Sequence, residues 1–163
     1  MSTPASHIRV LSIDPTSRGF GFAVFEGSDR LIDWGVVRVR TGNQRLCINR
    51  IEKLIERYRP CTLVIEETRR ESRRGPRVRH LLISIKKLAA KRRMKLKAVL
   101  QRQVRLLSSQ TGATTKYEIA ELIAKRFPEL APHLPPPRKP WNSEAEMMAV
   151  FDAVAFALTL YGG

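Results

Sequence analysis

Five short runs of hydrophobic residues predict five β-strands. Short turns join the first three runs, so we expect these strands to form an antiparallel meander. The fourth run is wholly apolar, which is typical of a central strand that is buried on both faces. The fifth run is also compatible with a helix. The predicted strands cover residues 8–13, 21–25, 31–39, 62–65 and 96–100.

Four longer segments have hydrophobic residues at helical spacing and predict α-helices. They cover residues 45–58, 78–93, 115–127 and 143–160. The last two begin with capping boxes, Thr115 with Glu118 and Ser143 with Glu146, and a proline-rich irregular stretch lies between them. A strand meander followed by alternating helices and strands predicts an α/β fold. Its mixed five-stranded sheet, an antiparallel meander plus parallel strands, would be flanked by helices.

Three acidic residues lie where apolar elements are predicted. Asp14 and Glu66 each follow an apolar strand, and Asp152 interrupts the apolar helical stretch "AVFDAVAFAL". A lone buried carboxylate is costly, so each acid needs a partner. An Asx-turn, an arginine or a backbone donor would satisfy any one of them. Together the three favour a cluster that holds a divalent cation, because Mg²⁺ prefers carboxylate oxygens and such ions support phosphodiester hydrolysis.

Composition limits the classes of function. The 163 residues predict a single domain, 1–163, and 30 Lys and Arg against 15 Asp and Glu give a net charge of +15. This charge favours a polyanionic partner. Cys47 and Cys61 form no zinc motif, and we expect both thiols to be buried. No signal peptide or membrane-length apolar run is recognisable, which predicts a cytoplasmic protein with no membrane partner and no small-molecule cofactor.

The positive charge is concentrated between residues 69 and 105, where 15 of the 30 basic residues occur with one acid. Part of this stretch directly follows Glu66 and predicts phosphate binding beside the acids. The alternative is a solvated basic surface. Few aromatic residues interleave with the charges, which favours duplex arms over single strands. The predicted nucleic-acid-binding residues are Arg69, Arg70, Arg73, Arg74, Arg77, Arg79, Lys86, Lys87 and Arg105.

Four segments resemble, in order, motifs of RuvC-type Holliday junction resolvases in the RNase H-like superfamily. They read "SIDPTSRGFGFAV", "LVIEET", "RQVR" with "GATTKYEIAEL", and "FDAVAFALTLY". The resemblance extends from about residue 8 to residue 160. It implies an RNase H-like fold, a Mg²⁺- or Mn²⁺-dependent nuclease centre and branched double-stranded DNA as the substrate. It also implies a homodimer, since symmetric cutting of a junction needs two active sites.

Residue by residue, Asp14, Glu66 and Asp152 match metal ligands of that family, and Lys116 matches a lysine near the scissile phosphate. The resemblance therefore implies these four residues as the catalytic set, with Arg105 in the position of a further basic residue. The sequence also departs from the family pattern. Ala149 stands where a further Asp or His ligand often occurs, Arg69 replaces an aromatic wedge, and Thr16 replaces a loop glycine.

The sequence thus predicts a metal-dependent, structure-selective DNA endonuclease that resolves four-way junctions. One alternative is an RNase H-like nuclease with another substrate, such as a flap or an RNA–DNA hybrid. A second alternative is a nucleic-acid-binding module whose metal site is impaired, which the alanine at position 149 favours.

Overall fold

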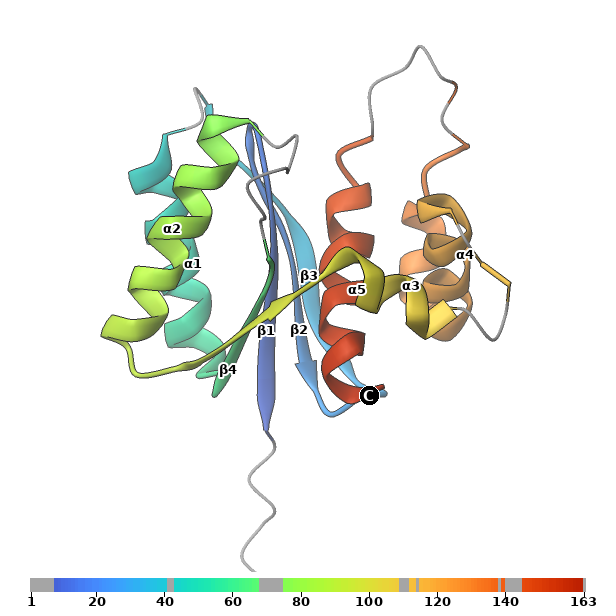
Figure 1. Ribbon diagram of the computed structural model, residues 1–163, viewed down its shortest axis with the longest axis horizontal. Helices are drawn as coiled ribbons and strands as arrows, with labels where there is room; N and C mark the ends of the chain where they lie inside the picture. The colour runs from blue at the N-terminus through green and yellow to red at the C-terminus, as the bar shows by residue number, and fades with distance from the viewer. Residues whose placement is uncertain are drawn as a thin grey trace, which may run out of the picture.

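The computed structural model describes residues 8–40, 43–67, 75–108, 112–113, 115–137, 139 and 145–162. A central β-sheet separates two groups of helices (Figure 1). Helices α1 (Gln44–Tyr58) and α2 (Pro76–Lys91) cover one face of the sheet. Helix α5 (Met148–Tyr161) covers the other face, and α3 (Gln101–Ser108) and α4 (Lys116–Arg126) pack outside it.

The sheet has five strands in the order β3-β2-β1-β4-β5. Strand β1 pairs antiparallel with β2, and β2 pairs antiparallel with β3. On the other side, β1, β4 and β5 run parallel. The predicted mixed sheet is confirmed, including the fifth strand. The strands are β1 (Arg9–Thr16), β2 (Gly19–Glu26), β3 (Leu31–Arg38), β4 (Thr62–Glu66) and β5 (Lys95–Val99).

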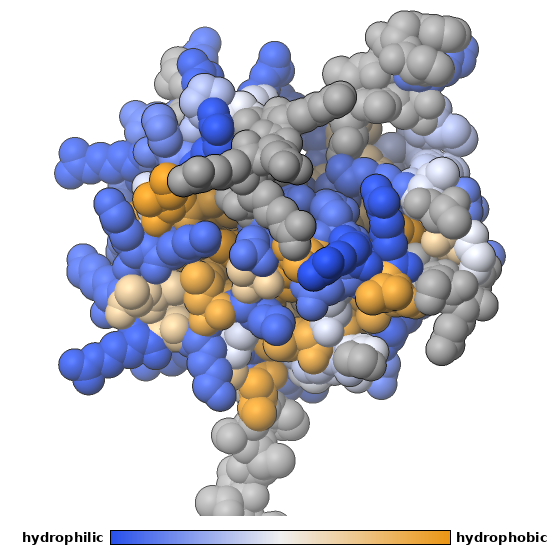
Figure 2. Space-filling view, in the orientation of Figure 1, coloured by the Kyte–Doolittle hydropathy of each residue, from blue (hydrophilic) through white to orange (hydrophobic). Residues whose placement is uncertain are grey.

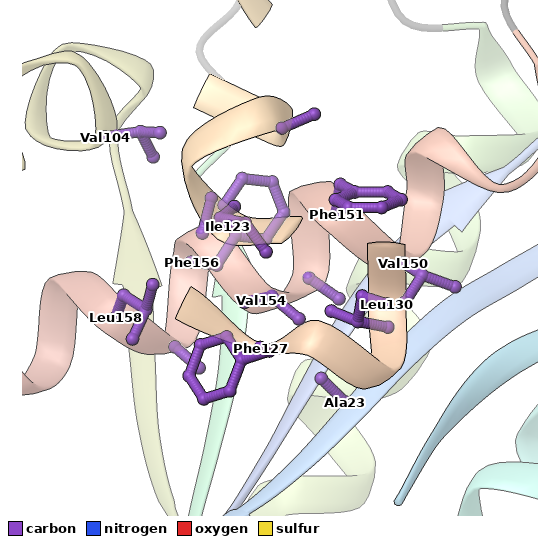
Figure 3. Packing of buried hydrophobic residues seen from close by; sticks show 14 of the residues in the cluster. Ala23, Val104, Ile123, Phe127, Leu130, Val150, Phe151, Val154, Phe156 and Leu158 are labelled. Carbon is purple, nitrogen blue, oxygen red and sulfur yellow. The ribbon is translucent and has the colours of Figure 1, made fainter. Parts of the chain in front are cut away.

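Alternation along β1 creates two separate hydrophobic cores. Leu11 and Ile13 are fully buried against α1 and α2. Val10 belongs to the other core, together with α5, because successive side chains of a strand point to opposite faces. Figure 3 shows this second core, to which α5 contributes Val154 and the chain segment after α4 contributes Phe127. The nearly all-apolar sequence of α5 follows from this position between the sheet and α4.

Of the two predicted capping boxes, one has its N-cap confirmed and the other is wrong. The Thr115 hydroxyl accepts a hydrogen bond from the Glu118 amide at 3.1 Å and donates one to the Glu118 carboxylate at 3.0 Å. Helix α5, in contrast, begins at Met148, and no side chain caps it. The Glu146 carboxylate binds Arg38 at the end of β3 instead, so a long-range ion pair replaces the local cap. Ser143 lies outside the described residues.

Three further details differ from the prediction. Helix α3, directly after β5, was not predicted from the hydrophobic pattern, and the segment Pro128–His133 forms a 3₁₀ helix where the sequence indicated an irregular stretch. Cys47 is buried as expected, but Cys61 is exposed because it precedes β4 at the end of the sheet. No helix among the described residues is long and apolar enough to cross a membrane.

Candidate active site

Asp14 and Glu66 lie on the same face of the sheet as α5. Asp14 follows Val10 by four residues along β1, and Glu66 follows Val64 by two along β4; both valines belong to the core beneath α5. Because β1 and β4 are parallel neighbours, their carboxyl ends meet at one edge of the sheet. Both acids are buried, with only 4% of Asp14 and 8% of Glu66 exposed.

A close approach between β2 and α5 brings the third acid to this edge. Gly21 pairs with Asp14 across the β1–β2 ladder. A Cβ atom at Gly21 would lie 2.4 Å from the carbonyl carbon of Ala149, so α5 rests directly on the glycine backbone. Asp152 follows Ala149 by three residues and therefore occupies the same face of the helix, one turn further along. Its burial is similar to that of the other acids, with 7% exposed.

Asp14, Asp152 and Lys116 line one open groove of about 540 Å³. The groove is bounded by the β1–β2 turn, the first turn of α2 and the chain segment that enters α5. The Lys116 ammonium lies 2.8 Å from Asp152 Oδ2. Since 45% of the lysine side chain is exposed, the ammonium is paired with a buried acid and also accessible from the groove.

Glu66 connects to the same region through Gln101 at the start of α3. The Gln101 side-chain amide donates a hydrogen bond to Glu66 Oε1 at 3.0 Å. Gln101 also lines a second hollow of about 280 Å³, together with Arg105, Lys116 and Asp152. Sequence reasoning missed Gln101, because α3 was not predicted and a neutral amide gives no charge signal. Arg105 does lie close to the predicted catalytic residues.

The donor atoms of the three acids suit a hard divalent cation, because Mg²⁺ and Mn²⁺ take carboxylate oxygens. The acids lie on one face of one sheet edge, and Asp14 and Asp152 share a groove. However, among the described residues no three His, Cys, Asp or Glu side chains are close enough together to hold a metal ion. Lys116 is instead the cation that contacts Asp152.

Glu146 is a fourth acid at the groove, but it is bound to Arg38. The hydrogen bond from Arg38 and the charge of Glu146 raise the pKa of the guanidinium above its ordinary value. This ion pair ties the chain segment before α5 to the end of β3. Glu146 therefore belongs to the wall of the groove and stabilises its shape.

The structure describes the positions of some of the predicted nucleic-acid-binding residues, and their role stays a prediction. Val78 in the first turn of α2 lines the groove, and its exposed neighbours Arg77 and Arg79 lie at that edge. Lys86 and Lys87 are exposed about 12 Å further along the helix, taking 1.5 Å per residue. Figure 2 shows hydrophilic side chains projecting from the side where Figure 1 places α1 and α2. Arg69, Arg70, Arg73 and Arg74 lie outside the described residues.

No protein-family model and no curated protein matches the sequence. Among solved structures, that of Thermus thermophilus RuvC is similar over 95% of this chain and 94% of that chain, with 22% identity and a TM-score of 0.66. The structure of T. thermophilus RuvC in complex with a Holliday junction substrate is similar over 96% and 94%, with 21% identity and a TM-score of 0.67. The chain therefore has the RuvC-type, RNase H-like fold that the sequence motifs indicated.

Proposed function

We propose that this protein is a divalent-metal-dependent DNA endonuclease that hydrolyses phosphodiester bonds in branched DNA, with four-way junctions as its substrate. The observation that carries the proposal is the open groove in which Asp14, Asp152 and Lys116 meet at the edge of a RuvC-type sheet. A protein with this fold has been solved with a Holliday junction substrate, which supports the choice of DNA.

In this proposal Asp14, Glu66 and Asp152 are the residues that hold Mg²⁺ or Mn²⁺. Such an ion, when bound, supplies charge stabilisation for phosphodiester hydrolysis. Gln101 fixes the orientation of the Glu66 carboxylate through its 3.0 Å hydrogen bond. The Lys116 ammonium offsets negative charge on the phosphate from the exposed side of the groove. Because the ammonium also contacts Asp152, a metal ion and Lys116 compete for that carboxylate.

The basic surface next to the groove is proposed to hold the duplex arms. Arg77 and Arg79 flank the groove-lining Val78 at the start of α2, and Lys86 and Lys87 extend the positive charge along the helix. Contacts of this kind bind phosphates without reading sequence, as recognition of DNA shape requires. We also propose that two copies of the chain act together, because paired cuts in a junction need two active sites.

The experiment that tests the function is cleavage of a mobile four-way junction in Mg²⁺, in Mn²⁺ and in EDTA. A linear duplex, a flap and an RNA–DNA hybrid of the same sequence serve as comparison substrates. We expect paired symmetric nicks in the junction with either metal and none in EDTA. The variant Asp152→Asn keeps the side-chain shape, so it should bind the junction and fail to cut it. Cleavage of the hybrid or the flap in preference to the junction would contradict the proposed substrate.

One second candidate has an observation in its favour. Ala149 lines the groove at the position of a further family ligand, and the described residues form no ready three-acid metal group. A nucleic-acid-binding module with an impaired metal site would have both features. It predicts junction binding without nicks in all metals. It also predicts that Mg²⁺ leaves the melting temperature of the wild type unchanged, whereas a functional metal site would raise it.

A further inference from the structure

The β1–β2 turn contributes an arginine to the lining of the groove. Arg18 lines the same groove as Asp14, Lys116 and Asp152. The residue is exposed to solvent.

The backbone of this turn is held in place from both sides. The Arg18 amide donates to Thr16 Oγ1 at 3.3 Å, and the Arg18 carbonyl accepts from the Val39 amide at 2.7 Å. The next residue, Gly19, has a φ of 152°, and a Cβ there would lie 1.9 Å from the Val37 carbonyl oxygen. The turn therefore packs closely against β3, and the backbone of Arg18 is held in one position.

Among the described residues that line the groove, Lys116 is the other basic side chain, and it is paired with an acid, as is Arg38 beside the groove. Lys116 binds Asp152, and Arg38 binds Glu146. Within the part of the chain that the structure describes, no carboxylate lies within ion-pair distance of Arg18. Its five N–H donors are thus available for an external anion, and their planar arrangement fits the paired oxygens of a phosphate.

We propose that Arg18 binds a backbone phosphate of the DNA strand that lies in the groove and positions this strand against Asp14 and Asp152. The inference rests on the proposed function. It follows from the charges of the groove, because Asp14, Asp152 and Glu146 repel a phosphate, and Lys116, the other basic residue of the described lining, shares its ammonium with Asp152. Arg18 then supplies the attraction that brings the phosphate close to the carboxylates.

The test measures binding of a four-way junction in EDTA across a series of salt concentrations. Arg18→Ala should bind about tenfold more weakly than the wild type, and the slope of log affinity against log salt should fall by about one, as expected for one lost phosphate contact. Arg18→Lys should keep the wild-type slope with part of the affinity lost, because an ammonium cannot replace the planar fork. Arg50→Ala is the matched control, since Arg50 is an exposed arginine on α1, away from the groove.

A second measurement separates a phosphate contact from a change in the fold. A junction with neutral methylphosphonate linkages around the cleavage position should bind more weakly to the wild type, whereas Arg18→Ala should lose less affinity with this change. All variants should melt close to the wild-type temperature. Wild-type binding by Arg18→Ala, or an equal loss in Arg50→Ala, would overturn the role of Arg18 and leave the proposed function intact. If the wild type binds no DNA, both proposals fail.

Discussion

The contact between Gly21 and Ala149 leads to the sharpest prediction, because it sets the distance between the sheet and α5. A Cβ atom added at Gly21 would lie 2.4 Å from the Ala149 carbonyl carbon and 2.6 Å from its carbonyl oxygen. Ordinary van der Waals contact begins at about 3.4 Å, so the new Cβ atom of Gly21→Ala would lie about 0.8–1.0 Å too close to these two atoms. The obstructing atoms are backbone, so they move only if α5 or β2 moves.

The size of the effect follows from this displacement. Forcing one extra methyl group into a closely packed site costs about 1–3 kcal/mol. For a domain of this size each kcal/mol lowers the melting temperature by about 2–4 °C, so the melting temperature of Gly21→Ala should fall by about 2–12 °C. Gly21 pairs with Asp14, and Ala149 lies one turn before Asp152, so the displacement separates two proposed metal ligands. A misplacement of about 1 Å can reduce an enzymatic rate on the order of 100-fold.

Thermal melting and junction cleavage measure the two effects separately. Gly35→Ala is the control, because its Cβ would meet ring atoms of Phe22 at 3.2 and 3.4 Å, and a side chain can adjust where a backbone cannot. This variant should melt near the wild type and cut at the wild-type rate. The double variant Gly21→Ala with Ala149→Gly removes the Ala149 methyl group and leaves its carbonyl in place. We therefore expect no rescue.

Two results would refute this reasoning. Wild-type melting and cleavage by Gly21→Ala would mean that β2 and α5 are farther apart than the structure shows. Full rescue by Ala149→Gly would mean that the new side chain at Gly21 collides only with the Ala149 methyl group, and not with the backbone of α5.

Three further predictions concern other parts of the molecule. Lys116→Ala should cut the junction slowly but bind it well. Mg²⁺ should raise the melting temperature of this variant more than that of the wild type, because the ammonium no longer competes for Asp152. Equal cleavage by both proteins would remove Lys116 from the mechanism. Replacing Arg77 and Arg79 by Ala should lower the salt slope of DNA binding by about two, and an unchanged slope would show that the start of α2 does not touch phosphate. At pH 8 a thiol reagent should label only exposed Cys61, because burial of Cys47 raises the pKa of its thiol and blocks access of the reagent. Labelling of both cysteines in the folded protein would contradict the packing of α1.

Strand periodicity made much of the site predictable from sequence. Apolar runs that end near Asp14 and Glu66 indicated central strands, and in the structure the parallel pairing of β1 and β4 places both acids at one edge. Asp152 stood out because a carboxylate is rare in so apolar a helix. In these cases the signal is local, since neighbouring residues alone fix the side of the strand or helix on which the acid lies.

The contacts that were missed join residues far apart in the chain. Glu146 has the spacing of a helix cap, but it binds Arg38, which is 108 residues away. Gln101 orients Glu66 from a short helix, α3, that was not predicted. Gly21 looked like an ordinary strand residue, and its importance depends on α5, which begins more than a hundred residues later. Such partners are decided by how the helices pack on the sheet, which local sequence does not encode.

Ala149 offers a direct test of whether the groove is built around a cation. It is 3% exposed, lines the groove with Asp14 and precedes Asp152 by one helical turn. Ala149→Asp would add a carboxylate to this cluster. In EDTA the added charge and bulk should lower the melting temperature, because like charges repel when they are buried close together.

Mg²⁺ should reverse this loss in the aspartate variant. If the added oxygen tightens ion binding tenfold, saturating Mg²⁺ contributes about 1.4 kcal/mol more than in the wild type, or about 3–6 °C in melting temperature. Ala149→Asn has almost the same shape without the charge, so it should lose stability in EDTA and recover far less with Mg²⁺. An equal response of the two variants to Mg²⁺ would show that position 149 does not face the cation, and that a carboxylate there cannot complete the site.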